Sequence, residues 1–521
     1  MNKRSSVNLA DIIRTLTGLG RRVAVSGVRD KRRYLKAGLP GVTASLLLCA
    51  CATSPERKPS LPLEIPETWA TAADAATPTA WLRDFRAPEL EALVFEALGN
   101  NPRLEATAAR FAQTIAEARI SGAERMPSAG LGLSGNKQKI NSFGPASTGG
   151  VVFENYDLAL NLSWELDLWG RSRDRTSAAL ARVEGSEADL YGVQLSLAAQ
   201  TTKAWFNLIE AQQQLALAER TAQAYRDNRN ALESRFKRGL TEGFDLRRMR
   251  TQTASAEADA ATRQRALDRA TRQLEVVLGR YPEGTLRSNI RLPELPPAVP
   301  AGLPAALLQR RPDLIAAERQ LAAADREYHA SKKELLPQIS LTASGGTSSQ
   351  EFGNLLDGDF SVWTLVGNLT QPIFQGGRIL ANIDRNAALR DQAVANYRDI
   401  ALRAFLEVET TLAAEQILRD EQDKLTIAAD EATKTEALAW ERYRSGIGDF
   451  LSALDAQRTA DAARGRRIRA ANLLLQNRID LYLALGGDFA DASNRVGVSP
   501  VVGRTEPTAS ARLGDNAELL R

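Results

Sequence analysis

The alternation of apolar and polar residues is strongest between residues 156 and 168. Every even-numbered residue in this stretch is apolar, whereas most odd-numbered residues are polar. A period of two is typical of a β-strand with one apolar and one polar face. The stretch is about a dozen residues long and has an aromatic residue, Tyr156, at one end of its apolar face, as a tilted membrane-spanning strand requires. Taken alone, it fits a half-buried strand of a soluble sheet equally well.

The same pattern recurs 207 residues later, from Trp363 to Thr370, and Gly377-Arg378 then answers Gly170-Arg171. Because both copies keep the same kinds of residue on the same face, we interpret them as strands with one side toward lipid. The predicted lipid-facing residues are Tyr156, Leu158, Leu160, Leu162 and Trp164 in the first copy and Trp363, Leu365 and Leu369 in the second.

A very long helical pattern without proline follows each strand. The first runs from Gly170 to Arg238, about 69 residues, which at 1.5 Å per residue corresponds to roughly 100 Å. Gly239 ends it, and a return helix is predicted from about Phe244 to Leu278. The same order recurs from about Arg378 to Arg444 and from about Phe450 to Leu485.

Shorter elements precede each strong strand. The helical pattern from about Ala87 to Arg125 is interrupted at Pro102, so two helices are predicted there, followed by a weak strand near 129–138. A shift of 210 residues gives the equivalent segment of the second half, which begins at Pro312. Each half therefore reads helix, strand, strand, very long helix, return helix. The predicted fold is α+β, mostly α, with an internal duplication and four strands per chain.

The domain organisation follows from these patterns. The predicted segments are a leader over 1–50, a lipidated tether over 51–80, a first repeat over 81–290, a Pro-rich bridge over 291–301, a second repeat over 302–488 and a disordered tail over 489–521.

The leader has the layout of a signal peptide. A basic cluster precedes an apolar run from Ala37 to Ala50, which is too short to be a membrane anchor. The run ends in Leu48-Cys49-Ala50-Cys51, which resembles a bacterial lipoprotein box. The resemblance implies cleavage before Cys51 and acylation of its sulfur, and Ala52 in place of an acidic residue points to the outer membrane. The alternative is two ordinary cysteines in an apolar run.

Charge and the sparse candidate chemistry exclude several function classes. The net charge is +4, but residues 1–50 hold ten Lys and Arg and only two acids, so the remainder is mildly acidic and no nucleic-acid partner is predicted. The single histidine, His329, offers too few ligands for a metal site, and a structural role is predicted for it. Arg310 and Arg311 are assigned to a turn, with a pairing to Asp313, rather than to an anion site. The chain is therefore predicted to be no enzyme and to hold no cofactor.

Four amphipathic strands cannot close a barrel, and open sheet edges are not tolerated in lipid. If the strands span a membrane, several chains must associate, while the long polar helices project into water. The pattern thus favours a duct in which a barrel of strands continues into a barrel of helices. The competing hypothesis is a non-conducting, lipid-anchored coiled-coil scaffold, for which the lipid-facing alternation of both strands has no use.

The chain resembles the TolC-like outer membrane factors, specifically the lipoprotein (NodT/OprM-like) branch of tripartite drug-efflux systems, over about residues 65–488. The matching segments are Trp81, Phe85, Pro88-Glu89-Leu90, Ala97-Leu98-Gly99-Asn100-Asn101-Pro102, Trp164-Glu165-Leu166-Asp167-Leu168-Trp169-Gly170-Arg171, Arg235-Phe236-Lys237-Arg238-Gly239-Leu240, Gly302-Leu303-Pro304, Leu308-Gln309-Arg310-Arg311-Pro312-Asp313-Leu314, Arg442-Tyr443-Arg444-Ser445-Gly446 and Leu454-Asp455-Ala456-Gln457.

This resemblance implies a homotrimer with a 12-stranded barrel in outer membrane lipid and a long periplasmic α-helical barrel. A periplasmic adaptor (membrane fusion) protein and an inner-membrane RND-type transporter would dock at its closed tip and open it. Drugs or other small molecules would then pass outward without chemistry in this chain. The alternative cargo is a secreted protein or polysaccharide.

The resemblance also implies which residues form the periplasmic gate. It places the constriction on the final return helix at Leu451 and Asp455, which are four residues apart and share a helix face. Three copies of Asp455 would form an acidic ring that attracts cations; the alternative is that Asp455 lies on an ordinary solvated face. Asp245 and Tyr443 are implied as a latch of the tip, although the arginine that some relatives use nearby corresponds to Gly448 here.

Overall fold

The computed structural model describes residues 66, 68–70, 80–141, 150–289, 291–297, 299 and 304–489. All of them belong to one compact unit of the chain. The predicted signal peptide, the predicted lipidation site Cys51 and the predicted tail beyond residue 489 lie outside the described residues.

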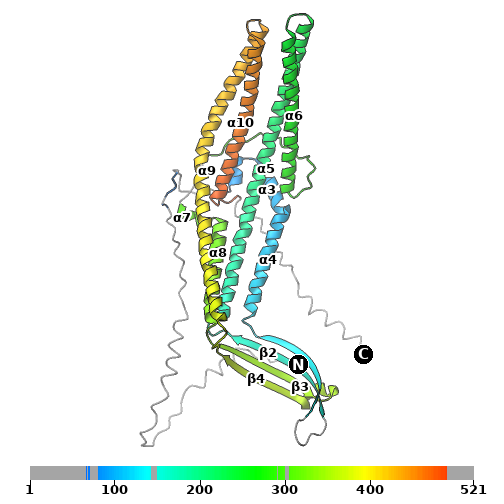
Figure 1. Ribbon diagram of the computed structural model, residues 1–521, viewed down its shortest axis with the longest axis vertical. Helices are drawn as coiled ribbons and strands as arrows, with labels where there is room; N and C mark the ends of the chain where they lie inside the picture. The colour runs from blue at the N-terminus through cyan, green and yellow to red at the C-terminus, as the bar shows by residue number, and fades with distance from the viewer. Residues whose placement is uncertain are drawn as a thin grey trace, which may run out of the picture. The chain divides into compact units, whose positions relative to one another are not determined.

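Helices make up most of the described part, and they are interrupted by two pairs of strands (Figure 1). In chain order the elements are η2 (Trp81–Phe85), α3 (Pro88–Asn100), α4 (Pro102–Ala123), β1 (Ser128–Ile140), β2 (Val151–Leu166), α5 (Arg171–Lys237), α6 (Gly243–Val277), α7 (Pro304–Leu307), α8 (Pro312–Lys333), β3 (Gln338–Ser349), η3 (Phe352–Leu356), η4 (Gly358–Phe360), β4 (Ser361–Thr370), α9 (Arg378–Arg444) and α10 (Phe450–Ala484).

The internal duplication is confirmed, because equivalent helices of the two halves have equal lengths. Helices α4 and α8 each contain 22 residues, α5 and α9 each contain 67, and α6 and α10 each contain 35. Both hairpins turn at a glycine in the left-handed region, Gly239 with φ 73° and Gly446 with φ 78°, a conformation that side chains with a Cβ rarely adopt.

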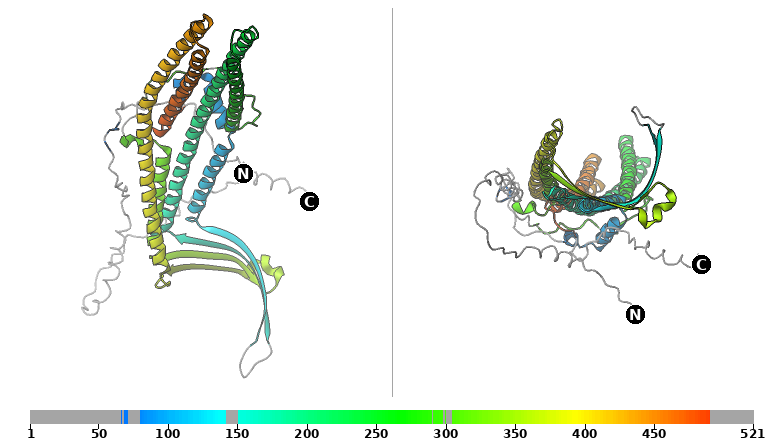
Figure 2. Two further views of the ribbon diagram at one scale, coloured as in Figure 1. Left: turned by 45° about the horizontal axis from the view of Figure 1, so that its top comes forward. Right: turned by 90° about the horizontal axis from the view of Figure 1, so that it is seen from below.

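The four strands form one antiparallel sheet in the order β1-β2-β3-β4. Directly paired residues share a face, so Leu131, Leu160, Gly345 and Trp363 form one row across the sheet. The same registers place all eight predicted lipid-facing residues on a single face. The edge strands β1 and β4 are exposed along their whole length. Figure 2 shows that the sheet is strongly curved.

The largest buried cluster lies between the N-terminal helices, the middle of α5 and the C-terminal ends of α6 and α10. Trp81 stacks on Tyr482 with ring centroids 5.4 Å apart, and Phe85 meets Phe206 edge-on at 5.2 Å. A second aromatic cluster, around Phe450, lies near the helical turns. The N-terminal segment is thereby held against helices that come from both halves of the chain.

Two local features differ from the sequence predictions. Strand β2 begins at Val151, five residues before the predicted start, because Val151 to Phe153 pair with the end of β1. Two short 3₁₀ helices, η3 and η4, precede β4, where the sequence predicted a plain loop. Among the described helices, none combines the length and apolar composition needed to cross a membrane.

Candidate functional site

The apolar face of the sheet is the first candidate site. Trp363, Leu365 and Leu369 on the edge strand β4 are at least 69% exposed, and Leu160 and Trp164 on β2 are also exposed. At one end of this face the ring of Phe352 from η3 meets Tyr156, with centroids 5.6 Å apart. An exposed apolar face of this extent is typical of a surface that meets lipid or another protein.

The opposite face of the sheet is polar. Asn161, Ser344 and Thr364 form a row on it. Near the far end of the sheet the Asn155 amide donates to the Asp157 carboxylate at 2.7 Å. The Ser348 hydroxyl donates to Asn155 Oδ1 at 3.1 Å. A sheet that is apolar on one side and polar on the other has the two-sided chemistry of a barrel wall around a water-filled lumen.

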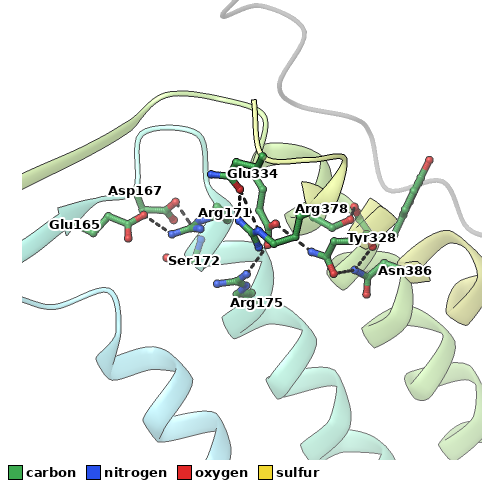
Figure 3. A network of polar contacts seen from close by, with 12 residues as sticks. Glu165, Asp167, Arg171, Ser172, Arg175, Tyr328, Glu334, Arg378 and Asn386 are labelled. Carbon is green, nitrogen blue, oxygen red and sulfur yellow. Dashed lines mark hydrogen bonds and ion pairs between the residues drawn. The ribbon is translucent and has the colours of Figure 1, made fainter. Parts of the chain in front are cut away.

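The junction between sheet and helices is fixed by charged side chains (Figure 3). The Asp167 carboxylate accepts the backbone N–H groups of Ser172 and Arg173 at 3.1 and 2.8 Å, so it satisfies free donors at the start of α5. Arg171, the first residue of α5, pairs with Glu165 at the end of β2, with 2.5 Å between nitrogen and oxygen. These contacts set the angle at which the strand passes into the helix.

Further pairs tie this junction to the second half of the chain. Lys333 Nζ lies 2.6 Å from Asp174 Oδ2, and both side chains are largely buried. Arg175 pairs with Glu334 at 2.9 Å, and Glu334 also accepts the Asn382 amide at 3.1 Å. Helices α5, α8 and α9 are therefore joined next to the sheet, at the end where the strands continue into helices.

The predicted gate residues lie at the beginning of α10. Leu451 and Asp455 are both exposed, whereas the intervening Leu454 is buried. The preceding Asp449 caps the helix by accepting the Ser452 N–H at 2.8 Å, and the hydrogen bonds from Ser452 lower the pKa of Asp449. Leu451 and Asp455 thus stand side by side on a free face of a well-anchored helix.

The two predicted latch residues lie near each other at the tip, with different contacts. The Asp245 carboxylate accepts the Thr241 hydroxyl at 3.5 Å. The Tyr443 ring faces the Arg235 guanidinium at 5.4 Å and meets Phe450 at 5.7 Å. Burial raises the pKa of Tyr443; Arg235 opposes this shift and the Asp245 charge adds to it. Within the described residues, no hydrogen bond joins Asp245 to Tyr443.

Sequence reasoning missed the role of Arg235 at this tip. Its guanidinium comes from α5, in the first hairpin, and lies over an aromatic ring of the second hairpin. Its Nε is buried and has no hydrogen-bond partner among the described residues. The segment Arg235-Phe236-Lys237-Arg238 contains three cations, and nothing in the sequence distinguishes the first from the other two.

A second residue without a sequence signal is Arg478, which is completely buried in α10. Its guanidinium makes two hydrogen bonds to Glu415 on α9, at 2.9 and 2.7 Å. It also donates to the carbonyl groups of Pro296 and Pro297, at 3.0 and 2.6 Å. One side chain therefore connects the Pro-rich bridge between the halves to both helices of the second hairpin.

The remaining chemical candidates, His329 and Arg311, both lie beside acidic side chains. His329 is 3.5 Å from Asp325 one helical turn away. The described part of the chain contains no group of three or more metal-binding side chains. Arg311 pairs with Asp313, as the sequence predicted, at 2.7 Å, and also with Glu407 at 2.7 Å.

These features together define a class of protein. A four-stranded sheet with one apolar face and β1 and β4 as its edge strands, continued by helical hairpins of 67 and 35 residues, is the subunit architecture of an outer membrane factor channel. The sequence model of the family described as "Outer membrane efflux protein" matches residues 93–280 and 303–487. The chain belongs to this family.

Individual relatives agree with this assignment. The chain is 32% identical to the outer membrane protein OprJ of Pseudomonas aeruginosa over 468 residues, which cover 88% of this chain and 97% of OprJ. It is 31% identical to the toluene efflux pump outer membrane protein TtgF of Pseudomonas putida over 418 residues, 80% of this chain and 86% of TtgF.

The fold also matches a solved channel. The open-state MtrE outer membrane channel of Neisseria gonorrhoeae superposes with a TM-score of 0.73 at 28% identity, covering 82% of this chain and 96% of MtrE. The predicted family, the predicted fold and the predicted function as an outer membrane efflux channel are confirmed.

Proposed function

We propose that three copies of the chain close a 12-stranded barrel in the outer membrane and continue as a helical barrel through the periplasm. The observation that carries this proposal is the sheet itself. It presents an apolar face, and on the outer edges of β1 and β4 no other described strand is paired. In lipid each unpaired backbone group costs several kcal/mol, so the edges must meet partners. A ring of copies satisfies every edge.

The proposed duct works as the exit channel of a tripartite efflux system. A periplasmic adaptor protein and an inner-membrane RND-type transporter would supply the opening and the driving force, and this chain would supply a passive path without a chemical step. The relative TtgF is the outer membrane protein of a toluene efflux pump, which supports small molecules as cargo. A protein or polysaccharide cargo is the alternative.

The gate of the duct is proposed at Leu451 and Asp455. Both side chains are exposed on one face of α10 near the tip of the hairpin, where a symmetric assembly can bring three copies together. Asp245 and Tyr443 are proposed as the latch. The stacking of Arg235 on Tyr443 supports a tip contact between the two hairpins that opening would have to break.

The membrane attachment is proposed to combine the barrel with a lipid anchor. The sulfur of Cys51 would carry the acyl group, and the side chains of the apolar face would contact the acyl chains of the outer membrane. The predicted tether that follows Cys51 would join the anchor to the helical part of the duct.

Gel mobility of the purified native protein tests the barrel directly. Closed barrels resist denaturation by detergent at room temperature, so unboiled samples should migrate as a trimer and boiled samples as a monomer. Cells that lack the gene should also accumulate a fluorescent efflux substrate until the native chain is restored. Migration as a monomer with and without boiling, together with substrate accumulation that restoring the native chain leaves unchanged, would instead favour the lipid-anchored scaffold.

A further inference from the structure

The internal duplication relates the residue-by-residue pairing of the strands in one half to the pairing in the other half. In the first half Ala129 of β1 pairs with Leu162 of β2. The residues 210 and 207 positions later, Ile339 and Leu369, pair with each other in the second half. Leu131 and Leu160 also pair, and the residues that correspond to them in the second half, Leu341 and Gly367, pair with each other as well. The transformation that relates the two halves therefore predicts strand pairing correctly where it can be checked.

A third pairing, between β2 and β3, has no counterpart within the chain. It joins the last strand of the first half to the first strand of the second half. The equivalent pairing would join β4, the last strand of the second half, to β1, the first strand of the first half. Because β1 and β4 lie at opposite edges of the sheet in one chain, this β1 must come from a second copy. Both β4 and β1 are outer strands of the described sheet, so each has one edge that no described strand pairs with.

From this relation we propose that β4 of one copy pairs antiparallel with β1 of a second copy in the register that places Leu369 opposite Leu133. The template for this register is the observed pairing of β2 with β3, in which Leu162 and Ala343, the residues that correspond to Leu369 and Leu133, lie opposite each other. The neighbouring template pair, Asn161 with Ser344, becomes Asn368 with Ser134. The inference rests on the proposed trimeric barrel and specifies its subunit contact.

The chemistry of this register is consistent along the strand. Leu133 and Leu369 lie on the apolar face of their own sheets, so pairing them continues that face across the subunit boundary. At the end of the sheet away from the helices, Trp363 comes beside Lys139, and the neighbouring Leu365 beside Lys137. An aromatic ring and lysine side chains suit the boundary between lipid and water.

Contacts between the helices next to the sheet support the same relation between the two halves. The template contact between α5 and α8 includes the largely buried pair of Asp174 and Lys333, 2.6 Å apart. Their counterparts in α9 and α4 are Ala381 and Ala123, both exposed in the single chain. Both charges are replaced together, so at this position the seam between copies holds no unpaired charge.

Disulfide cross-linking distinguishes this register from its neighbours. A shift by one residue would turn one apolar face toward the lumen, so the competing registers differ by two. Opposed residues in antiparallel strands have Cα atoms about 4.5–5.5 Å apart, within the range that a disulfide spans. Residues displaced by two lie about 7–8 Å apart, beyond that range.

The experiment uses outer membranes that contain the full chain with Leu369→Cys combined with Leu133→Cys, Leu131→Cys or Gly135→Cys. Leu131 and Leu133 lie on the same face and are both exposed, so the first two variants are closely matched. After mild oxidation, the Leu133 variant should give covalent dimers and trimers at least several-fold more abundantly than the other two. The native chain controls for its own cysteines.

The intrachain variant Leu162→Cys with Ala343→Cys is the positive control, because its strands are paired in the observed structure. Preferential cross-linking of the Leu131 or the Gly135 variant would overturn the proposed register while leaving the trimer intact. The register would be equally wrong if uncross-linked samples were trimers and the positive control oxidised, but no interchain product formed. Monomers throughout would overturn the register and the trimeric barrel together.

Discussion

Removal of the buried Arg478 guanidinium should destabilise the helical part of the protein more than any exposed charge does. The side chain is 0% exposed and makes two hydrogen bonds to Glu415 and two to backbone carbonyl groups of the Pro-rich bridge. In Arg478→Met the Glu415 carboxylate stays largely buried and keeps only the partly exposed Arg419, 2.8 Å away, as a partner. The carbonyl groups lose their donor. Breaking a buried ion pair from one side costs about 3–5 kcal/mol.

The assay is urea unfolding followed by far-ultraviolet ellipticity at one protein concentration. Arg403→Met is the matched control, because Arg403 pairs with Asp399 at 3.0 Å in the same hairpin but is 72% exposed. Exposed pairs contribute about 0–1 kcal/mol. The double variant Arg478→Met with Glu415→Met should cost less than the two single variants combined, because neither member of this buried pair is left without the other.

The reasoning would be refuted if Arg478→Met shifted the unfolding midpoint no further than Arg403→Met does. Strictly additive costs in the double variant would show that Arg478 and Glu415 act independently. In that case the Pro-rich bridge is held by its backbone packing rather than by the buried charge.

Two further stability predictions follow from single side chains. Asn101 caps α4 by accepting the Arg103 N–H at 3.0 Å and donates to the Val277 carbonyl at 2.9 Å, so Asn101→Ala should cost about 0.5–2 kcal/mol in the same unfolding assay. Burial raises the pKa of Asp461 against the opposing hydrogen bonds from Thr221 and Arg464. Protonation of Asp461 therefore favours the folded state, and this stabilisation is lost as the pH rises through the folded pKa. The stability of Asp461→Asn relative to the native protein should increase from about pH 4 to about pH 8, and a constant difference would contradict this.

The element boundaries could be predicted because the chain carries local stop signals. Pro102 begins a helix, and Gly239 and Gly446 adopt the positive φ that ends the long helices. The faces of the strands were equally predictable, since a period of two assigns each side chain to one side. The start of β2 was predicted five residues late, because Val151 to Phe153 break the alternation although they continue the pairing.

Contacts between helices could not be predicted in the same way. Helical periodicity indicates which face of a helix is buried, but the partner depends on how each helix is rotated about its axis. Arg478 and Glu415 are 63 residues apart, and Arg235 and Tyr443 belong to different halves of the chain. The gate residues were placed by family resemblance. The structure adds that Leu451 and Asp455 are exposed on one face, which a symmetric constriction requires.

Single-channel conductance in planar bilayers is the most direct test of a gated exit duct. Purified native protein should show a small, mostly closed conductance, because three copies of Leu451 and Asp455 are proposed to narrow the tip. The double variant Leu451→Ala with Asp455→Ala should conduct clearly more. A large native conductance that the double variant leaves unchanged would place the gate elsewhere. The absence of conductance in both proteins, from folded trimers shown to insert into the bilayer, would contradict the channel itself.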